Sequence, residues 1–239
     1  MADPAVDESM RVAVLFDVDG TLVDTTYLHT VCWWQALRRY GLTVSAAEIH
    51  RAIGMGSDHL LESLLGAERD RDRDAALSAD HDALFAVYWP SLVPLDGAAA
   101  LLRECSERGW RVVLATSAKR AELDAMRAAL GAEDALDEIT SADDVEASKP
   151  SPDIVELALE RAGVPADRAV FIGDTRWDVE AAKRADVACI GMLSGGWADT
   201  ELLEAGAAAV CRNPAALRDD LDHLIAERFR PRRADRQGT

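Results

Sequence analysis

The sequence predicts an α/β protein in which a parallel sheet is interrupted, after its first strand, by a helical insert. The first observation is the apolar run VAVLF at residues 12–16, which is typical of a short buried strand. The second is the stretch 27–91, where apolar residues recur at helical spacing and no strand-like run occurs. The third is the alternation of strand-like and helical segments from residue 95 onward, which indicates helices on both faces of a parallel sheet.

The predicted insert contains four helices, each with its own start or stop signal. Gly41 ends the first, and Ser45 with Glu48 forms a capping-box pattern at the start of the second. Ser57 or Asp58 provides the N-cap of the third. The four helices are expected at residues 27–40, from 45 onward, from 57 to about 66, and at 74–89 before a proline.

Turn-forming residues at 94–97 return the chain to the sheet. Strands are then expected at residues 111–115, around 139, at 169–172, 187–192 and 208–211. Helices are expected at residues 98–108, 120–129, 151–162, 175–185 and 214–227. We therefore assign residues 10–24 and 95–227 to a sheet-containing core domain, 25–94 to a helical cap domain, and 1–9 and 228–239 to flexible termini.

Composition narrows the classes of function. A chain of 239 residues with 49% hydrophobic content can bury a sizeable core, and its net charge of −17 argues against a nucleic-acid partner. No stretch approaches the length of a membrane span, and the acidic N-terminal segment lacks the apolar part of a secretory signal. The four cysteines are far apart and show no metal-binding or redox spacing, so we expect a reducing, cytoplasmic location.

Reactive side chains directly follow several of the predicted strands. Asp17 and Asp19 follow the first strand, where open α/β sheets place their ligand sites. Two carboxylates this close repel each other unless a divalent cation, or a division into one acid and one base, relieves the repulsion. The later strands add Thr116 with Ser117, and Asp174 with Thr175 and Asp178, while Lys149 lies in the loop sequence between them.

In this order, the motifs identify a family. The chain resembles the haloacid dehalogenase superfamily of phosphohydrolases, in the group with a helical cap inserted after the first strand. Phosphoglycolate phosphatase and β-phosphoglucomutase are members of that group. The resemblance covers residues 12–224 and rests on residues 17–25, Thr116, residues 149–152, and residues 173–175 with Asp178. It implies a Rossmann-like core and a phosphatase acting on a small phosphorylated metabolite, such as a sugar phosphate or phosphoglycolate.

The resemblance also implies a role for each carboxylate. Asp17 would be the nucleophile that forms an aspartyl-phosphate, and Asp19 the general acid and then the base. The role of Asp19 requires a pKa above that of Asp17. Mg²⁺ would be held by Asp17, Asp174 and the backbone carbonyl of Asp19, and hard oxygen ligands suit this ion. Asp178 would act on the metal indirectly or through water.

The remaining matched residues would bind the phosphoryl group. By resemblance, Thr116 and Lys149 hold its oxygens, and Lys149 neutralises charge in the transition state. Backbone amides around Gly20, Thr21 and Ser117 would add donors. The cap would select the substrate. Its candidate contacts are His29, Trp33, Gly54, Ser57, Asp58 and His59.

Departures from related enzymes separate the alternatives. Haloalkanoic-acid dehalogenases lack an acid at the position of Asp19, and phosphonatases use a cap lysine that this chain does not have. A β-phosphoglucomutase-like mutase stays open because His29, Trp33 and residues 116–119 match its pattern. Against it, Ser57 stands where those mutases place a phosphate-binding arginine. A non-catalytic binding protein on the same scaffold is the third alternative. The sequence leaves monomer and homodimer equally open.

Overall fold

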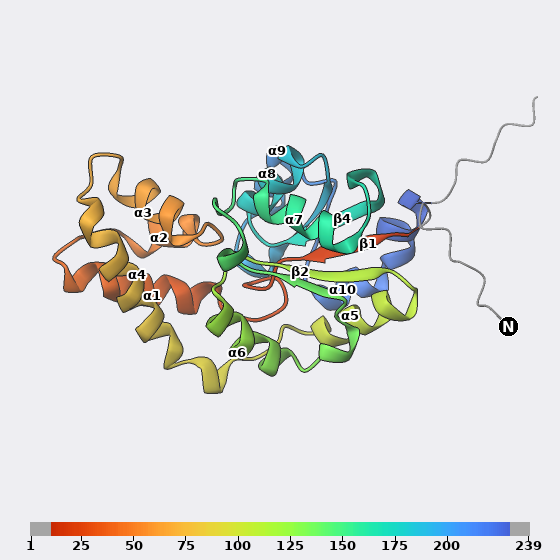
Figure 1. Cartoon of the computed structure of the whole chain (residues 1–239), viewed down its shortest axis with the longest axis horizontal. Coiled ribbons are helices and arrows are strands. Elements are labelled where there is room, and N and C mark those ends of the chain that lie inside the picture. Colours follow the sequence, from red (N-terminus) through yellow and green to blue (C-terminus); the bar gives the residue numbers. More distant parts are fainter. Residues whose placement is uncertain (1–10, 230–239) are drawn as a thin grey trace, which may run out of the picture.

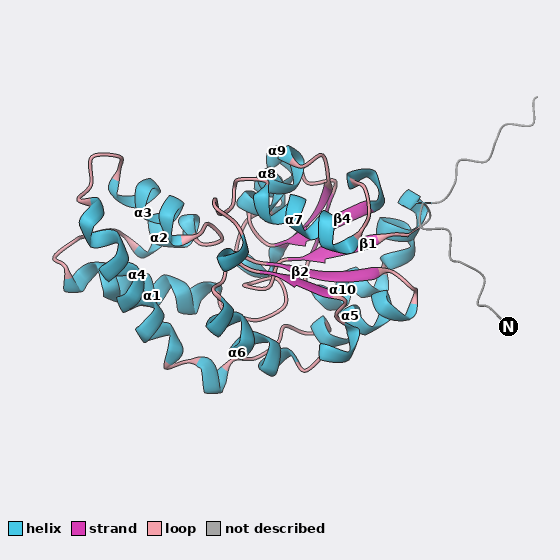
Figure 2. Cartoon of the chain, viewed as in Figure 1, coloured by secondary structure: helices cyan, strands magenta, loops and turns pink. Residues whose placement is uncertain are grey.

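A computed structural model of the chain describes residues 11–229 and confirms the α/β fold class. Six strands form one sheet in which every pairing is parallel, in the order β3-β2-β1-β4-β5-β6 (Figure 2). The strands are β1 (Ala13–Phe16), β2 (Arg111–Ala115), β3 (Glu138–Thr140), β4 (Ala169–Gly173), β5 (Ala188–Met192) and β6 (Ala209–Cys211). Because β1 lies between β2 and β4, the residues that follow it face the centre of the sheet edge.

Helices cover both faces of the sheet, with α5 and α6 below it and α7, α8 and α9 above it in Figure 1. Alternate residues of β1 are buried on opposite faces of the sheet. Val14 and Phe16 belong to the apolar cluster on one face, and Ala13 and Leu15 belong to the cluster on the other. The helices are α5 (Ala98–Glu107), α6 (Arg120–Leu130), α7 (Asp153–Ala162), α8 (Arg176–Arg184), α9 (Asp199–Ala205) and α10 (Pro214–Asp219).

Four helices between β1 and α5 form a separate lobe, on the left in Figure 1, which we call the helical segment. The side chains of Ser45 and Glu48 form the predicted capping box. The segment has its own buried cluster, which includes Trp33 and Leu37, whereas Cys32 and Phe85 belong to the cluster of the sheet. Its helices are α1 (Thr26–Arg39), α2 (Ala46–Ala52), α3 (Ser57–Leu65) and α4 (Asp74–Ala86).

The structure differs from the predicted elements at the C-terminal end. Helix α9 was not predicted, because it is only seven residues long and its first turn is polar. The predicted helix over 214–227 ends at Asp219, and a π-helical turn (Asp222–Ala226) and a 3₁₀ turn (Glu227–Phe229) follow it. Residues 228 and 229, predicted to start a flexible tail, therefore belong to a helical turn, and residues 1–10 and 230–239 lie outside the described residues.

None of the helices within residues 11–229 is both long and apolar enough to cross a bilayer.

Candidate active site

The parallel sheet brings the predicted site residues to one edge. Asp17, Thr116 and Asp174 each follow or end a neighbouring strand, and the backbone amide of Asp17 donates to Ile172 O at 2.9 Å. A cavity of about 270 Å³ opens between this edge and the helical segment. Asp17 and Thr116 line the cavity, whereas Lys149, Asp174 and Asp178 are buried beneath it.

A buried charge cluster lies at the floor of the cavity. Carboxylate oxygens of Asp17, Asp174 and Asp178 lie within 4.8 Å of one another. Lys149 Nζ donates to Asp17 Oδ1 at 2.5 Å and to Asp178 Oδ1 at 2.7 Å, although the lysine is only 1% exposed. The N-cap residue Thr175 donates to Asp178 Oδ2 through its hydroxyl at 2.6 Å and its amide at 3.0 Å. One lysine therefore joins two of the three carboxylates.

This cluster fits a divalent cation. The three buried carboxylates face one ammonium group, which bonds only Asp17 and Asp178, so a cation would balance the excess negative charge. Asp174 Oδ1 accepts from Thr21 at 2.9 Å, but Asp174 Oδ2 is buried without a hydrogen-bond partner. A Cβ atom on Gly20 or Gly195 would lie 2.3 or 1.9 Å from Asp174 Oδ2, so both glycines keep space around this orphan oxygen. Oxygen ligands of this kind suit Mg²⁺ or a similar hard ion.

The electrostatics of the cluster reflect the shortage of positive charge. Burial raises the pKa of Asp17 to about 7, with Asp178 and Asp19 adding to the shift and Lys149 opposing it. Burial and the two neighbouring carboxylates also raise the pKa of Asp174 well above its ordinary value. For Lys149, burial favours the neutral form, but Asp17 and Asp178 outweigh it and raise its pKa. Lys149 is therefore the fixed positive charge of the site.

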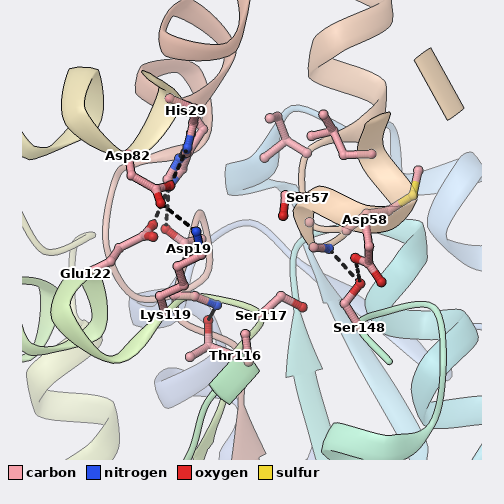
Figure 3. A pocket seen from close by; sticks show the side chains of 18 of the residues that line it. Asp19, His29, Ser57, Asp58, Asp82, Thr116, Ser117, Lys119, Glu122 and Ser148 are labelled. Carbon is pink, nitrogen blue, oxygen red and sulfur yellow. Dashed lines mark hydrogen bonds and ion pairs between the residues drawn. The ribbon is translucent and has the colours of Figure 1, made fainter. Parts of the chain in front are cut away.

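Asp19 lies on the side of the cavity opposite the charge cluster of Asp17, and a hydrogen-bond network begins at its carboxylate. Its Oδ1 contacts Thr25 Oγ1 at 2.7 Å and His29 Nε2 at 2.9 Å, and Glu122 lies 3.2 Å from the same histidine nitrogen. His29 Nδ1 contacts His81 Nε2 at 3.0 Å. Figure 3 shows His29 with Asp19, Asp82 and Glu122 around it. The hydrogen-bond network extends beyond His81. The Nδ1 of His81 lies 3.1 Å from Asp82, and Asp82 in turn pairs with Lys119 at 2.5 Å.

These contacts reverse one expectation from the sequence. Burial alone would lower the pKa of His29, but Asp19 and Glu122 raise it to about 10. Burial opposes ionisation of Asp19, yet the charge and hydrogen bond of His29 lower the pKa of Asp19 below its ordinary value. The prediction that Asp19 has a higher pKa than Asp17 is therefore wrong, because the imidazolium of His29 holds Asp19 ionised.

The residues predicted to bind a phosphoryl group lie between these two carboxylates. Thr116 is fully buried and its Oγ1 accepts from the backbone amide of Ala118 at 3.1 Å. Ser117 lines the cavity, and its Oγ is buried without a hydrogen-bond partner. Gly20 has φ +70°, which favours glycine, and Thr21 is buried against Asp174. The cavity is thus lined by Thr116 and Ser117, with Lys149 buried beneath it.

The cap-side candidates separate into two groups. His29, Trp33, Gly54, Ser57 and Asp58 line the cavity, and Figure 3 shows Ser57 and Asp58 opposite His29. His59 does not line it; its Nε2 lies 3.8 Å from Asp58 at the exposed start of α3.

Two contacts join this part of the helical segment to the core. Ser148 Oγ donates to Asp58 Oδ1 at 2.5 Å and accepts from the amide of Gly56 at 3.1 Å. A second junction lies at α2, where the ring of His50 contacts Gly195 O at 2.8 Å. Trp177 Nε1 donates to Arg51 O at 3.0 Å in the same junction. Together these contacts hold the helical segment over the strand ends.

Several residues that contact the predicted site residues belong to no motif of the sequence. His81, Asp82 and Glu122 extend the contacts of His29, and Ser148 joins the core to the helical segment. Two of these residues lie close to matched motifs in the sequence. Ser148 precedes the matched Lys149, and Glu122 is one turn beyond the matched residues 116–119.

Comparisons with known proteins give consistent results. Residues 12–186 match the family model described as haloacid dehalogenase-like hydrolase. A phosphoglycolate phosphatase from Rhodospirillum rubrum is 32% identical over 222 residues, which are 88% of this chain and 90% of that protein. The protein SUPPRESSOR OF QUENCHING 1, chloroplastic, from Arabidopsis thaliana is 30% identical over 221 residues, 89% of this chain but only 20% of that protein. A crystal structure of a hydrolase from Pseudomonas syringae superposes with a TM-score of 0.86 at 32% identity, covering 90% of this chain and 99% of that one.

Proposed function

Because the chain belongs to the haloacid dehalogenase-like hydrolase family, we propose that it is a Mg²⁺-dependent phosphatase of small phosphorylated metabolites. The observation that carries this proposal is the pair Asp17 and Asp19 on opposite sides of one cavity floor, with Lys149 bonded to Asp17. Mg²⁺ would be held by Asp17, Asp174 and the backbone carbonyl of Asp19. When bound, the ion supplies charge that orients the phosphoryl oxygens and lowers the cost of ionising the carboxylates.

The two carboxylates divide the reaction between them. Asp17 attacks phosphorus, its Oδ–P bond forms as the ester P–O bond breaks, and the product is an aspartyl-phosphate with a free alcohol. Asp19 is ionised at the outset, so the proton that it passes to the departing oxygen comes from the imidazolium of His29, which lies 2.9 Å from Asp19 Oδ1 and becomes neutral. In the second half-reaction Asp19 takes a proton from water, whose oxygen attacks phosphorus and releases phosphate and Asp17.

The surrounding residues hold the transferring group. Lys149 stays protonated because two carboxylates bond to it, so it neutralises charge as the phosphoryl group moves. Thr116 and Ser117 supply hydroxyl donors, whereas the predicted amide donors of Gly20 and Thr21 are already bonded to Val23 O at 2.8 Å and Val18 O at 3.3 Å. Asp178 acts through Lys149 and Thr175, since both of its oxygens are bonded to them. Residues 25–94 act as the cap, which excludes water while Asp17 attacks.

The arrangement favours a phosphatase over a mutase. A mutase must bind a second phosphate, yet no arginine lines the described cavity, and Asp58 lies where the second phosphate would have to approach. We place the enzyme in the cytoplasm, in keeping with the four cysteines, which are buried and unpaired. A monomer and a homodimer both fit this function, and light scattering after gel filtration distinguishes them.

The proposal is tested with a generic aryl phosphate in the presence of Mg²⁺. Asp17→Asn should abolish phosphate release, whereas Asp24→Asn, an exposed acid in the same motif, should retain it. Rapid acid quenching should trap ³²P on the wild-type protein and none on Asp17→Asn. Substantial phosphate release by the Asp17 variant would overturn the mechanism.

A further inference from the structure

The part of the cavity beyond the phosphoryl floor is lined by two acidic side chains that form no ion pair with a lysine or an arginine of the described residues. These side chains are those of Asp58 and Glu146. Asp58 is more than half exposed, and its nearest positively charged partner is His59 at 3.8 Å. Figure 3 shows Asp58 on one wall, with Asp82 and Glu122 on the opposite wall. A leaving group in this space therefore meets carboxylates on both sides.

The cationic side chains of the cavity are already engaged. Lys119 Nζ pairs with Asp82 Oδ2 at 2.5 Å. The imidazole of His29 is bonded to Asp19 and to Glu122. Burial lowers the pKa of His81 to about 4, with the charge of His29 contributing, so His81 is neutral. A carboxylate or a second phosphate on the leaving group would find no free cation here, and it would be repelled by Asp58 and Glu146.

The neutral groups of the cavity fit a hydroxylated carbon skeleton. Ser57 and Ser117 line the cavity, and a serine hydroxyl can donate to or accept from a hydroxyl of the leaving group. Ile53, Met55 and Leu60 supply apolar surface along the same wall. A volume of about 270 Å³ is at the small end of ligand pockets and suits a single ring.

We propose that the leaving group is a polyol or amino-polyol, and that esters carrying a carboxylate or a second phosphate are poor substrates. This inference rests on the proposed phosphatase function and narrows its substrate class. Ammonium and hydroxyl groups donate to Asp58 and Glu146, whereas an anionic group cannot. Glucosamine 6-phosphate, glucose 6-phosphate and 6-phosphogluconate represent the three charge states on similar skeletons.

Matched aryl phosphates isolate the effect of charge from that of shape. The probes are the 4-aminomethyl, 4-hydroxymethyl and 4-carboxymethyl phenyl phosphates, in which a methylene group separates the charge from the leaving oxygen. We expect kcat/KM to fall in that order, by roughly tenfold from the ammonium to the carboxylate ester. Raising the ionic strength should compress this ratio, because the two acids are close to solvent.

Substitutions test whether Asp58 and Glu146 cause the difference in kcat/KM between the ammonium and carboxylate esters. Glu146→Gln and Asp58→Asn together should remove most of the discrimination between the ammonium and carboxylate esters, and Glu68→Gln, an exposed acid outside the cavity, should leave it unchanged. Equal kcat/KM for the three esters, or a preference for the carboxylate, would overturn the inference while leaving the phosphatase function intact. Failure to release phosphate from any aryl ester would instead overturn the phosphatase function itself.

Discussion

Replacing Asp17 by asparagine should stabilise the metal-free protein above neutral pH while it abolishes turnover. Asp17, Asp174 and Asp178 form a buried cluster to which Lys149 contributes the bonded positive charge. Burial and the neighbouring acids raise the pKa of Asp17 to about 7. The folded protein therefore carries an unfavourable ionised carboxylate at this position whenever the pH is higher.

The size of the effect follows from linkage between protonation and folding. Below the ordinary pKa of 3.8, Asp17 is neutral in both the folded and the unfolded chain, so it does not affect stability. As the pH rises from 3.8 to about 7, the unfolded chain ionises first and the free energy of unfolding falls. Above pH 7 the loss amounts to about 4 kcal/mol. Asparagine avoids this loss, which corresponds to a Tm higher by roughly 8 to 16 °C for a chain of this size.

Thermal unfolding followed by circular dichroism in EDTA measures this difference. The Tm of Asp17→Asn should exceed that of the wild type at pH 8, and the gap should close near pH 4. Adding Mg²⁺ at pH 8 should raise the wild-type Tm more than the variant's, because the variant lacks a ligand. Asp24→Asn controls for the loss of an exposed acid. A Tm gap that is the same at pH 4 and pH 8, or a wild type that is as stable as the variant at pH 8, would refute the electrostatic reasoning.

Three further substitutions test other parts of the site. Lys149→Met should lower kcat by about 10²- to 10³-fold, and it should destabilise the protein in urea unfolding by about 3 to 5 kcal/mol, because it leaves buried carboxylates unpaired. Gly195→Ala should weaken Mg²⁺ binding in isothermal titration calorimetry, since the added Cβ would lie 1.9 Å from Asp174 Oδ2; unchanged affinity would contradict the orphan-oxygen assignment. His81→Phe should lower kcat by about tenfold with KM unchanged, because it keeps the aromatic stack but removes the partner of His29 Nδ1; an unchanged kcat would show that this contact does not position the acid.

Much of the fold could be predicted because the signals are local. The strand at residues 13–16 is a continuous apolar run, and the capping box at Ser45 lies within four residues. Helix α9 escaped prediction because its own signal is short and polar, whereas the end of α10 depends on contacts elsewhere in the chain. Near the C-terminus, Leu221 and Ile225 are both buried, so packing determines the path after α10 and overrides a continuous helical pattern.

In the site as well, some residues could be placed from the sequence next to them, whereas others depend on contacts between residues far apart in the sequence. Asp17, Thr116 and Asp174 could be placed together because parallel strands end at one edge of a sheet. The contact of His29 with His81 joins residues 52 positions apart, and no spacing rule predicts it. The pKa order of Asp17 and Asp19 likewise depends on which one has the cationic histidine beside it, a fact that only the packed structure supplies.

The central position of β1 has a consequence for biosynthesis. This strand is made first, yet its two partners in the sheet, β2 and β4, emerge from the ribosome only after the whole helical segment has been translated. Until β4 arrives, the apolar residues of β1 lack one of their two neighbouring strands. Within residues 11–229, we therefore expect the helical segment, which has its own buried cluster, to become compact before the sheet is complete.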